Sequence, residues 1–126
     1  MIVTSKLDPL DRVDAYLKLH EKYLKETEEL YAKRDLQQAG EKYWGAVAAL
    51  LSAVAEKRGL PHHSHRDYAE IIELLHEERG DAELTRLFAS AERLHANFYH
   101  GFLKKPSFEI HRRDALKLVE KLKLHL

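Results

Sequence analysis

Residues 92–100 hold the densest concentration of chemically active side chains, in the order Glu-Arg-Leu-His-Ala-Asn-Phe-Tyr-His. On an α-helix, Arg93, Asn97 and His100 fall within one narrow stripe away from the centre of the apolar arc. We expect this stripe to face solvent or a second subunit. An arginine offers permanent donors to a phosphate and a histidine titrates near neutral pH. The stripe is therefore a candidate catalytic site for metal-independent RNA cleavage, and an ordinary polar helix face is the alternative.

A second pair of polar rings follows helical spacing in the same segment. His95 and Tyr99 are four residues apart and fall at the edge of the predicted core. We treat them as candidate binding residues. The alternative is a structural role, in which this pair forms a hydrogen bond between two helices.

Three histidines crowd the segment that precedes the third predicted helix. His62, His63 and His65 offer imidazoles that bind zinc, copper or nickel, and Asp67 adds a carboxylate. Three histidines within four positions of an irregular loop have no fixed ligand geometry, so we predict no native metal site. In the alternative interpretation the loop is solvated, and Ser64 or His65 caps the following helix.

Motifs for several other chemistries are absent from the sequence. It contains no glycine-rich phosphate loop, no nucleophile elbow and no His-Glu-x-x-His motif. Residues 73–76 form a single Glu-x-x-His, which is half of what a di-iron helical bundle needs. We therefore predict no cofactor.

The composition is typical of long helices in a single domain covering residues 1–126. Hydrophobic residues make up 44% and charged residues 33%, with only 5 glycines and 3 prolines. No cysteine is present, which excludes disulfides and thiolate zinc sites. No apolar run approaches the ~20 residues that span a bilayer, and residues 1–6 lack the order of a signal peptide. We expect a soluble, cytoplasmic protein without membrane association.

Capping signals divide the chain into five helices, which predicts an all-α, up-and-down antiparallel bundle. We expect the first helix to run from Pro9 to near Arg34, and the third to cover about residues 66–78. The other three are expected to be capped by Asp35, Asp81 and Ser107. Apolar positions extend almost around the second helix, so it should be the most buried. The fourth should extend through Phe102 in the core. Gly40 and Gly45 predict close approach of neighbouring helices to the second.

Charge is balanced overall but divided unevenly along the chain. The sequence has 21 basic and 21 acidic residues, so it lacks the excess of basic residues that is expected of a protein binding polyanions non-specifically. Residues 104–126 carry seven basic residues against three acidic ones, whereas residues 67–92 carry eight acidic against two basic. The two oppositely charged segments either form a docking surface for a partner or are solvent-exposed helix faces whose charges balance each other.

Two stretches, residues 41–67 and 87–99, resemble the archaeal PaREP family, which is grouped with the HEPN-like superfamily (higher eukaryote and prokaryote nucleotide-binding domains). The first includes Glu-Lys-Tyr-Trp-Gly-Ala-Val, and the second includes Leu-Phe-Ala-Ser-Ala-Glu. The resemblance implies a bundle of about five helices, usually a homodimer. It also implies association with RNA or nucleotides, or pairing with a small nucleotidyltransferase.

Many HEPN-like proteins are ribonucleases that use an arginine followed, after four to six residues, by a histidine. Arg93 and His100 match with six residues between them, although Leu94 replaces a residue that is often polar. Arg58 and His63 also match, across a helix end. In the implied reaction His100 moves a proton at the 2′-hydroxyl or the leaving oxygen, Arg93 stabilises the charged phosphorane and Asn97 orients either group. Dimerisation would bring two stripes into one cleft.

A non-catalytic protein-interaction adaptor is the competing prediction. Residues 32–44 are faintly similar to a tetratricopeptide hairpin. Only one such unit is visible in the sequence, whereas solenoids need about three. The substitution His100→Ala separates the two functions, because an adaptor should tolerate it and a nuclease should not.

Overall fold

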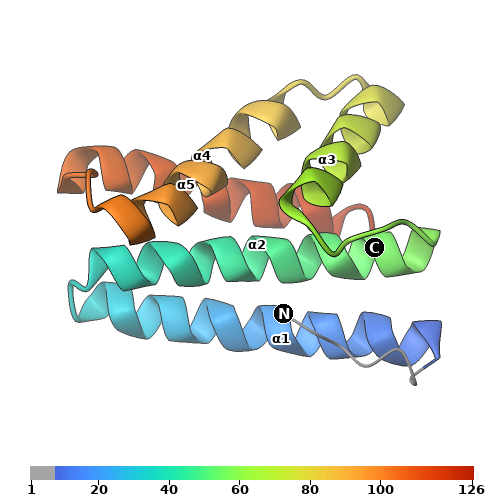
Figure 1. The fold of residues 1–126 in the computed structure, drawn as a ribbon, viewed down its shortest axis with the longest axis horizontal. Helices are drawn as coiled ribbons and strands as arrows, with labels where there is room; N and C mark the ends of the chain where they lie inside the picture. Colours follow the sequence, from blue (N-terminus) through green and yellow to red (C-terminus); the bar gives the residue numbers. More distant parts are fainter. Residues whose placement is uncertain (1–7) are drawn as a thin grey trace.

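The computed structural model describes residues 8–126, which form five α-helices and no strand (Figure 1). The helices are α1 (Pro9–Ala32), α2 (Leu36–Arg58), α3 (His65–Arg79), α4 (Glu83–His100) and α5 (Lys105–Lys123). The all-α antiparallel prediction is confirmed. Residues 1–6, where we expected no signal peptide, lie outside the described part. Within that part, no helix combines the length and apolar character that crossing a bilayer requires.

Helix α2 is the centre of the packing, as its wide apolar arc predicted. It forms an antiparallel hairpin with α1, and it also packs against α3, α4 and α5 (Figure 1). Both glycines allow the predicted close approach. A Cβ added at Gly45 would lie 3.2 Å from the ring of Tyr23 on α1, and one added at Gly40 would lie 3.4 Å from Phe108 on α5. The two glycines therefore mark opposite packing faces of α2.

Local capping sets most of the helix ends. Asp8, Asp35 and Ser64 accept hydrogen bonds from backbone N–H groups three residues ahead, at 3.1, 3.2 and 3.1 Å. Gly59 ends α2 with a φ of +68°, a conformation that suits glycine.

Three of the predicted boundaries are wrong. Helix α4 begins at Glu83 with Ala82 rather than Asp81 at its N-cap, although Asp81 Oδ1 accepts a hydrogen bond of 3.2 Å from the backbone N–H of Glu83. Helix α5 begins at Lys105 rather than after Ser107, because the first turn of a helix tolerates the missing N–H of Pro106. Helix α4 ends at His100, since Gly101 takes a φ of +59° and turns the chain. Phe102 then lies beyond the helix and is 39% exposed, not part of the core.

The uneven charge is partly neutralised within the chain. Lys117 and Lys121 of α5 lie 3.0 and 3.1 Å from Glu83 at the start of α4. Lys121 also lies 2.8 Å from Asp81. These pairs are reached by solvent, so each contributes little to stability. These ion pairs nevertheless connect the basic last helix to the acidic segment. They support the interpretation that the opposite charges of the two segments balance each other within the chain.

Candidate functional site

Helix α4 carries the two predicted groups of site residues on different edges. The guanidinium of Arg93 lies 4.3 Å from the ring centroid of Phe102, in the turn that leads to α5. On the other edge, His95 Nδ1 lies 2.8 Å from Glu41 Oε1 on α2. Tyr99 follows His95 and is 66% exposed. The structure therefore does not bring the predicted residues together at one centre.

Asn97 departs from the expectation that the stripe faces solvent. It is only 3% exposed, and its Oδ1 accepts a hydrogen bond of 2.7 Å from the backbone N–H of Leu103. Its backbone carbonyl accepts another, of 2.8 Å, from Gly101. The chain reverses direction at Gly101. The backbone N–H of Leu103 therefore lies next to the side-chain amide of Asn97. The side-chain oxygen of Asn97 therefore stabilises the turn after α4 and is not directed toward solvent.

Arg93 and His100 are both exposed, as predicted. A third basic side chain, His111 of α5, lies close by. Burial lowers the pKa of His111, the charge of Asp114 opposes that effect, and the nearby charge of Arg93 lowers the pKa further. We call Arg93, His100, Phe102 and His111 the α4–α5 edge. No carboxylate occurs between residues 93 and 108, so the segment that carries most of this edge is basic and aromatic.

His111 is held by a hydrogen-bonded chain between α4 and α5. Ser90 Oγ donates to Asp114 Oδ2 at 2.6 Å, and His111 Nδ1 lies 3.0 Å from Ser90 Oγ. This is not a catalytic triad, in which the histidine lies between serine and carboxylate. Because the Ser90 proton goes to Asp114, Nδ1 is the donor in the second bond. The neutral ring then has its lone pair on Nε2.

Sequence reasoning missed both His111 and Phe102. Eighteen positions separate Arg93 from His111 in the printed sequence, and they belong to different helices. No helical spacing therefore relates them. The carboxylate-free stretch that starts at Arg93 includes Phe102 but ends at Glu109, so it gave no signal for His111.

Trp44 of α2 is the centre of the second arrangement. The rings of His95 and His65 stack on the indole with centroid distances of 4.8 and 5.0 Å. Their own centroids are 6.3 Å apart. On opposite faces of the indole they would be separated by about the sum of the two stacking distances, so both lie on one face. His65 Nε2 is 2.6 Å from Glu92 Oε2, which parallels the pairing of His95 with Glu41.

We call Trp44, His65, His95, Glu41 and Glu92 the Trp44 platform. It joins α2, α3 and α4 through ring stacking and two imidazole–carboxylate contacts. Tyr99 adds its ring edge-on to His95 at 5.4 Å. The predicted hydrogen bond between helices at His95 is confirmed, which is the structural alternative given for this pair.

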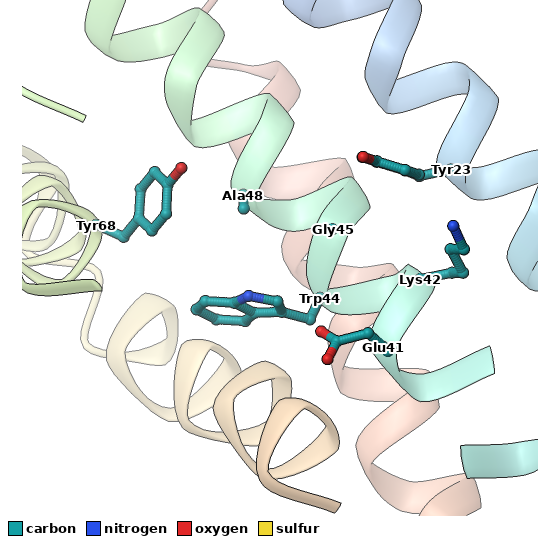
Figure 2. Close-up of a pocket in the computed structure, with 7 residues that line it drawn as sticks. All are labelled: Tyr23, Glu41, Lys42, Trp44, Gly45, Ala48 and Tyr68. Carbon is teal, nitrogen blue, oxygen red and sulfur yellow. The ribbon is translucent and has the colours of Figure 1, made fainter. Parts of the chain in front are cut away.

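A cleft of about 320 Å³ opens next to the platform, among α1, α2 and α3 (Figure 2). Gly45 forms part of its wall. The other side chains that line it are Tyr23, Glu41, Lys42, Trp44, Ala48 and Tyr68. Lys42 Nζ lies 2.9 Å from Glu26 Oε2 and 5.1 Å from the ring centroid of Tyr23. The sequence did not predict this cleft, because its walls come from three helices.

A model of the archaeal PaREP1/PaREP8 family matches residues 15–119. The chain belongs to the archaeal PaREP1/PaREP8 family. The match includes every residue of the Trp44 platform and of the α4–α5 edge. No curated protein and no solved structure matches the chain. The predicted resemblance to the PaREP family is thus confirmed.

In this PaREP1/PaREP8 protein the three loop histidines have separate hydrogen-bond partners, although the ring centroids of His62 and His63 are 4.5 Å apart. His62 is buried, and its Nε2 lies 2.7 Å from Glu56 Oε1. His65 belongs to the Trp44 platform, and the backbone N–H of His63 donates to Asp67 Oδ2 at 2.9 Å. Across residues 8–126, no group of three or more His, Asp or Glu side chains is arranged to hold a metal ion. The loop therefore serves packing and capping in this structure.

Proposed function

We propose that this PaREP1/PaREP8 protein is a HEPN-like, RNA-associated module that cleaves single-stranded RNA without a metal ion. The observation that carries the proposal is the α4–α5 edge, where the Arg93 guanidinium lies over the ring of Phe102, is near enough to His111 for its charge to act on that imidazole, and shares α4 with the exposed His100. The exposed ring of Phe102 adds a surface on which a base can stack. A cation, an aromatic ring and two imidazoles are the components that such a reaction uses.

The chemistry requires one base, one acid and a group that stabilises negative charge. His111 Nε2 accepts the proton of the 2′-hydroxyl, and the 2′-oxygen attacks phosphorus. Arg93 stabilises the charged phosphorane. The bond to the 5′-oxygen then breaks as that oxygen takes a proton from His100. The products are a 2′,3′-cyclic phosphate and a 5′-hydroxyl. Relative to the sequence-based expectation, His111 enters as the base and Asn97 has no catalytic role.

Two features support His111 as the base. Its Nδ1 donates to Ser90, which leaves Nε2 free to accept a proton. Burial lowers its pKa, so the ring is neutral at pH 7. His100 at the end of α4 is exposed and can reach the leaving oxygen of a strand lying along the edge.

A homodimer forms part of this proposal. One chain presents Arg93 and His100 on an open surface, and a second copy would close that surface into a cleft. Ile110, next to His111 in the sequence, is 53% exposed and Phe102 is 39% exposed, and each offers apolar area for such a contact. Light scattering should give twice the chain mass of 14.7 kDa, and Ile110→Lys should return the protein to a monomer.

The test is incubation of labelled single-stranded RNA with the purified protein in EDTA. We expect cleavage with 2′,3′-cyclic phosphate ends, and a loss of at least about 100-fold in Arg93→Ala, His100→Ala and His111→Ala. Arg66→Ala removes an exposed basic side chain outside the edge and should leave the rate unchanged. The same sequence made of DNA should stay intact, because it lacks the 2′-hydroxyl.

Equal cleavage by the wild type and the three variants would place the activity elsewhere. Absence of cleavage by the folded wild type would overturn the ribonuclease proposal. A non-catalytic interaction module would then be the better account of this fold.

A further inference from the structure

A hollow of about 330 Å³ lies at the end of the bundle that holds the α1–α2 turn and the turn after α4 (Figure 1). Its walls come from these two turns, from the start of α2 and from the last turn of α4. Gln37 fixes the walls relative to each other, because its Nε2 donates to the backbone oxygens of Phe98 and Asn97 at 2.9 and 3.2 Å. The volume is within the range of small-molecule sites.

Arg34, in the α1–α2 turn, supplies the observation that points to a ligand. Its φ is +62°, a left-handed conformation that glycine adopts freely but that costs free energy in a residue with a Cβ. Glycine occupies the other three left-handed positions between residues 8 and 126. Arg34 lines the hollow, and its guanidinium forms no ion pair or hydrogen bond with that part of the chain. The strained arginine therefore points to a group that the chain itself does not supply.

A carboxylate lines the hollow beside this cation. Asp35 uses Oδ1 to cap α2, where it accepts from the backbone N–H of Gln38 at 3.2 Å, and this leaves Oδ2 as an acceptor. A simple anion in the hollow would be attracted by Arg34 and repelled by Asp35. A ligand that carries one charge of each sign is complementary to both side chains.

The other walls contribute apolar surface and a hydrogen-bond donor. Leu36 and Leu103, both half-buried, line the hollow from α2 and from the turn after α4. Asn97 uses Oδ1 to accept from the backbone N–H of Leu103, which leaves its amide nitrogen as a donor. A complementary ligand therefore has a carboxylate, an ammonium group and an apolar side chain.

We propose that this hollow binds a free α-amino acid with an apolar side chain. The guanidinium of Arg34 holds the α-carboxylate through two parallel N–H groups, and Asp35 Oδ2 accepts from the α-ammonium group. The amide nitrogen of Asn97 donates to the same carboxylate. The ligand's side chain packs against Leu36 and Leu103. The site shares no residue with the α4–α5 edge and does not depend on RNA cleavage.

A titration of the full chain with leucine, followed by proton–nitrogen NMR at about pH 7, tests the proposal. We expect saturable shifts of the backbone amide signals of Arg34, Gln37 and Leu103, and none in α3, which does not line the hollow. N-acetyl-leucine lacks the ammonium group and leucinamide lacks the carboxylate, so each should bind at least about tenfold more weakly. Glycine lacks the apolar side chain and should also bind more weakly.

Two asparagine variants separate ligand binding from folding. Arg34→Asn and Asp35→Asn each remove one charge, while asparagine tolerates the left-handed conformation and is a good N-cap. We expect each variant to keep the helical circular dichroism of the wild type and to bind leucine at least about tenfold more weakly. Lys33→Asn is the matched control, since it removes an exposed cation that does not line the hollow. Its leucine binding should be unchanged.

Three results would overturn the proposal. Absence of a saturable shift with leucine, methionine and phenylalanine would show that the hollow takes no apolar amino acid. Equal affinity for leucine and N-acetyl-leucine would indicate a simple anion site without a role for Asp35. Unchanged binding in Arg34→Asn would mean that the left-handed arginine serves only the turn. His100→Ala should bind leucine as the wild type does, so loss of RNA cleavage in that variant tests the ribonuclease alone.

Discussion

His20 of α1 donates a hydrogen bond from Nδ1 to the backbone carbonyl oxygen of Ala46 on α2, at 2.7 Å. A carbonyl only accepts, so Nδ1 carries the proton and Nε2 does not. The ring is 1% exposed, and Nε2 is buried without a partner among the described residues. Burial is the main cause that lowers the pKa of His20. Burial between α1 and α2 thus favours the neutral imidazole of His20.

This contact predicts that stability falls on mild acidification. The pKa of His20 is lowered in the folded protein, whereas it is about 6.5 in the unfolded chain. Between those values the unfolded chain binds a proton that the folded state does not, so the free energy of unfolding decreases as the pH falls below about 6.5. His20→Asn cannot titrate and should show a smaller decrease. Urea denaturation at about pH 7.5 and about pH 5.5 compares the two proteins, and equal pH dependence would contradict the assignment.

Asn97→Ala should destabilise the protein by about 2 kcal/mol, because the partly buried N–H of Leu103 would lose its acceptor. Urea denaturation measures this change. Gln38→Ala, at an exposed helical position, serves as the control and should stay within about 0.5 kcal/mol of the wild type. An Asn97→Ala protein that kept full stability but lost RNA cleavage would instead restore the catalytic role expected from the sequence.

The two glycines of α2 should respond differently to alanine. Alanine favours a helix over glycine by about 1 kcal/mol. At Gly40 the added Cβ meets Phe108 and Leu94 at 3.4 and 3.5 Å, ordinary contact distances, so Gly40→Ala should raise the melting temperature. At Gly45 it would lie 3.2 Å from Tyr23, which must shift, and Gly45→Ala should lower it. Thermal unfolding, followed by circular dichroism, gives the melting temperatures of the wild type and the two variants. A higher melting temperature for Gly45→Ala than for Gly40→Ala would show that Tyr23 moves freely.

The pH dependence of RNA cleavage tests the role of His111. A base acts in its deprotonated form, so the cleavage rate should increase with pH as His111 loses its proton. Because burial lowers the pKa of His111, this increase should occur below about pH 6.5. The charge of Asp114 raises the pKa of His111. Asp114→Asn keeps an acceptor for Ser90 but removes this charge, and should move the rising limb to lower pH. Initial rates across a pH series measure the shift. An unmoved limb would mean that another group is the base.

Local signals were sufficient where a helix is set by groups a few residues apart. Asp35 caps α2 through the N–H of Gln38, and Gly59 ends it, so the printed sequence contains both partners within one turn. The same holds for Ser64 and α3. At the start of α5 two local signals gave different boundaries. Ser107 is a good N-cap, but Pro106 is also tolerated inside the first turn of a helix, so the helix can begin before it. Ser107 was therefore a wrong cap even though the helix itself was predicted.

The sequence by itself determined the five helices, their antiparallel packing around α2 and the exposed positions of Arg93 and His100, since helical period and caps act over a few residues. Tertiary structure alone decided which polar groups meet. The return of the chain after Gly101 buried Asn97, and packing of α5 on α4 placed His111 near Arg93. Packing of three helices around Gly45 opened the cleft beside Trp44. These contacts join side chains far apart in the sequence, and their geometry depends on how whole helices pack, which no local spacing encodes.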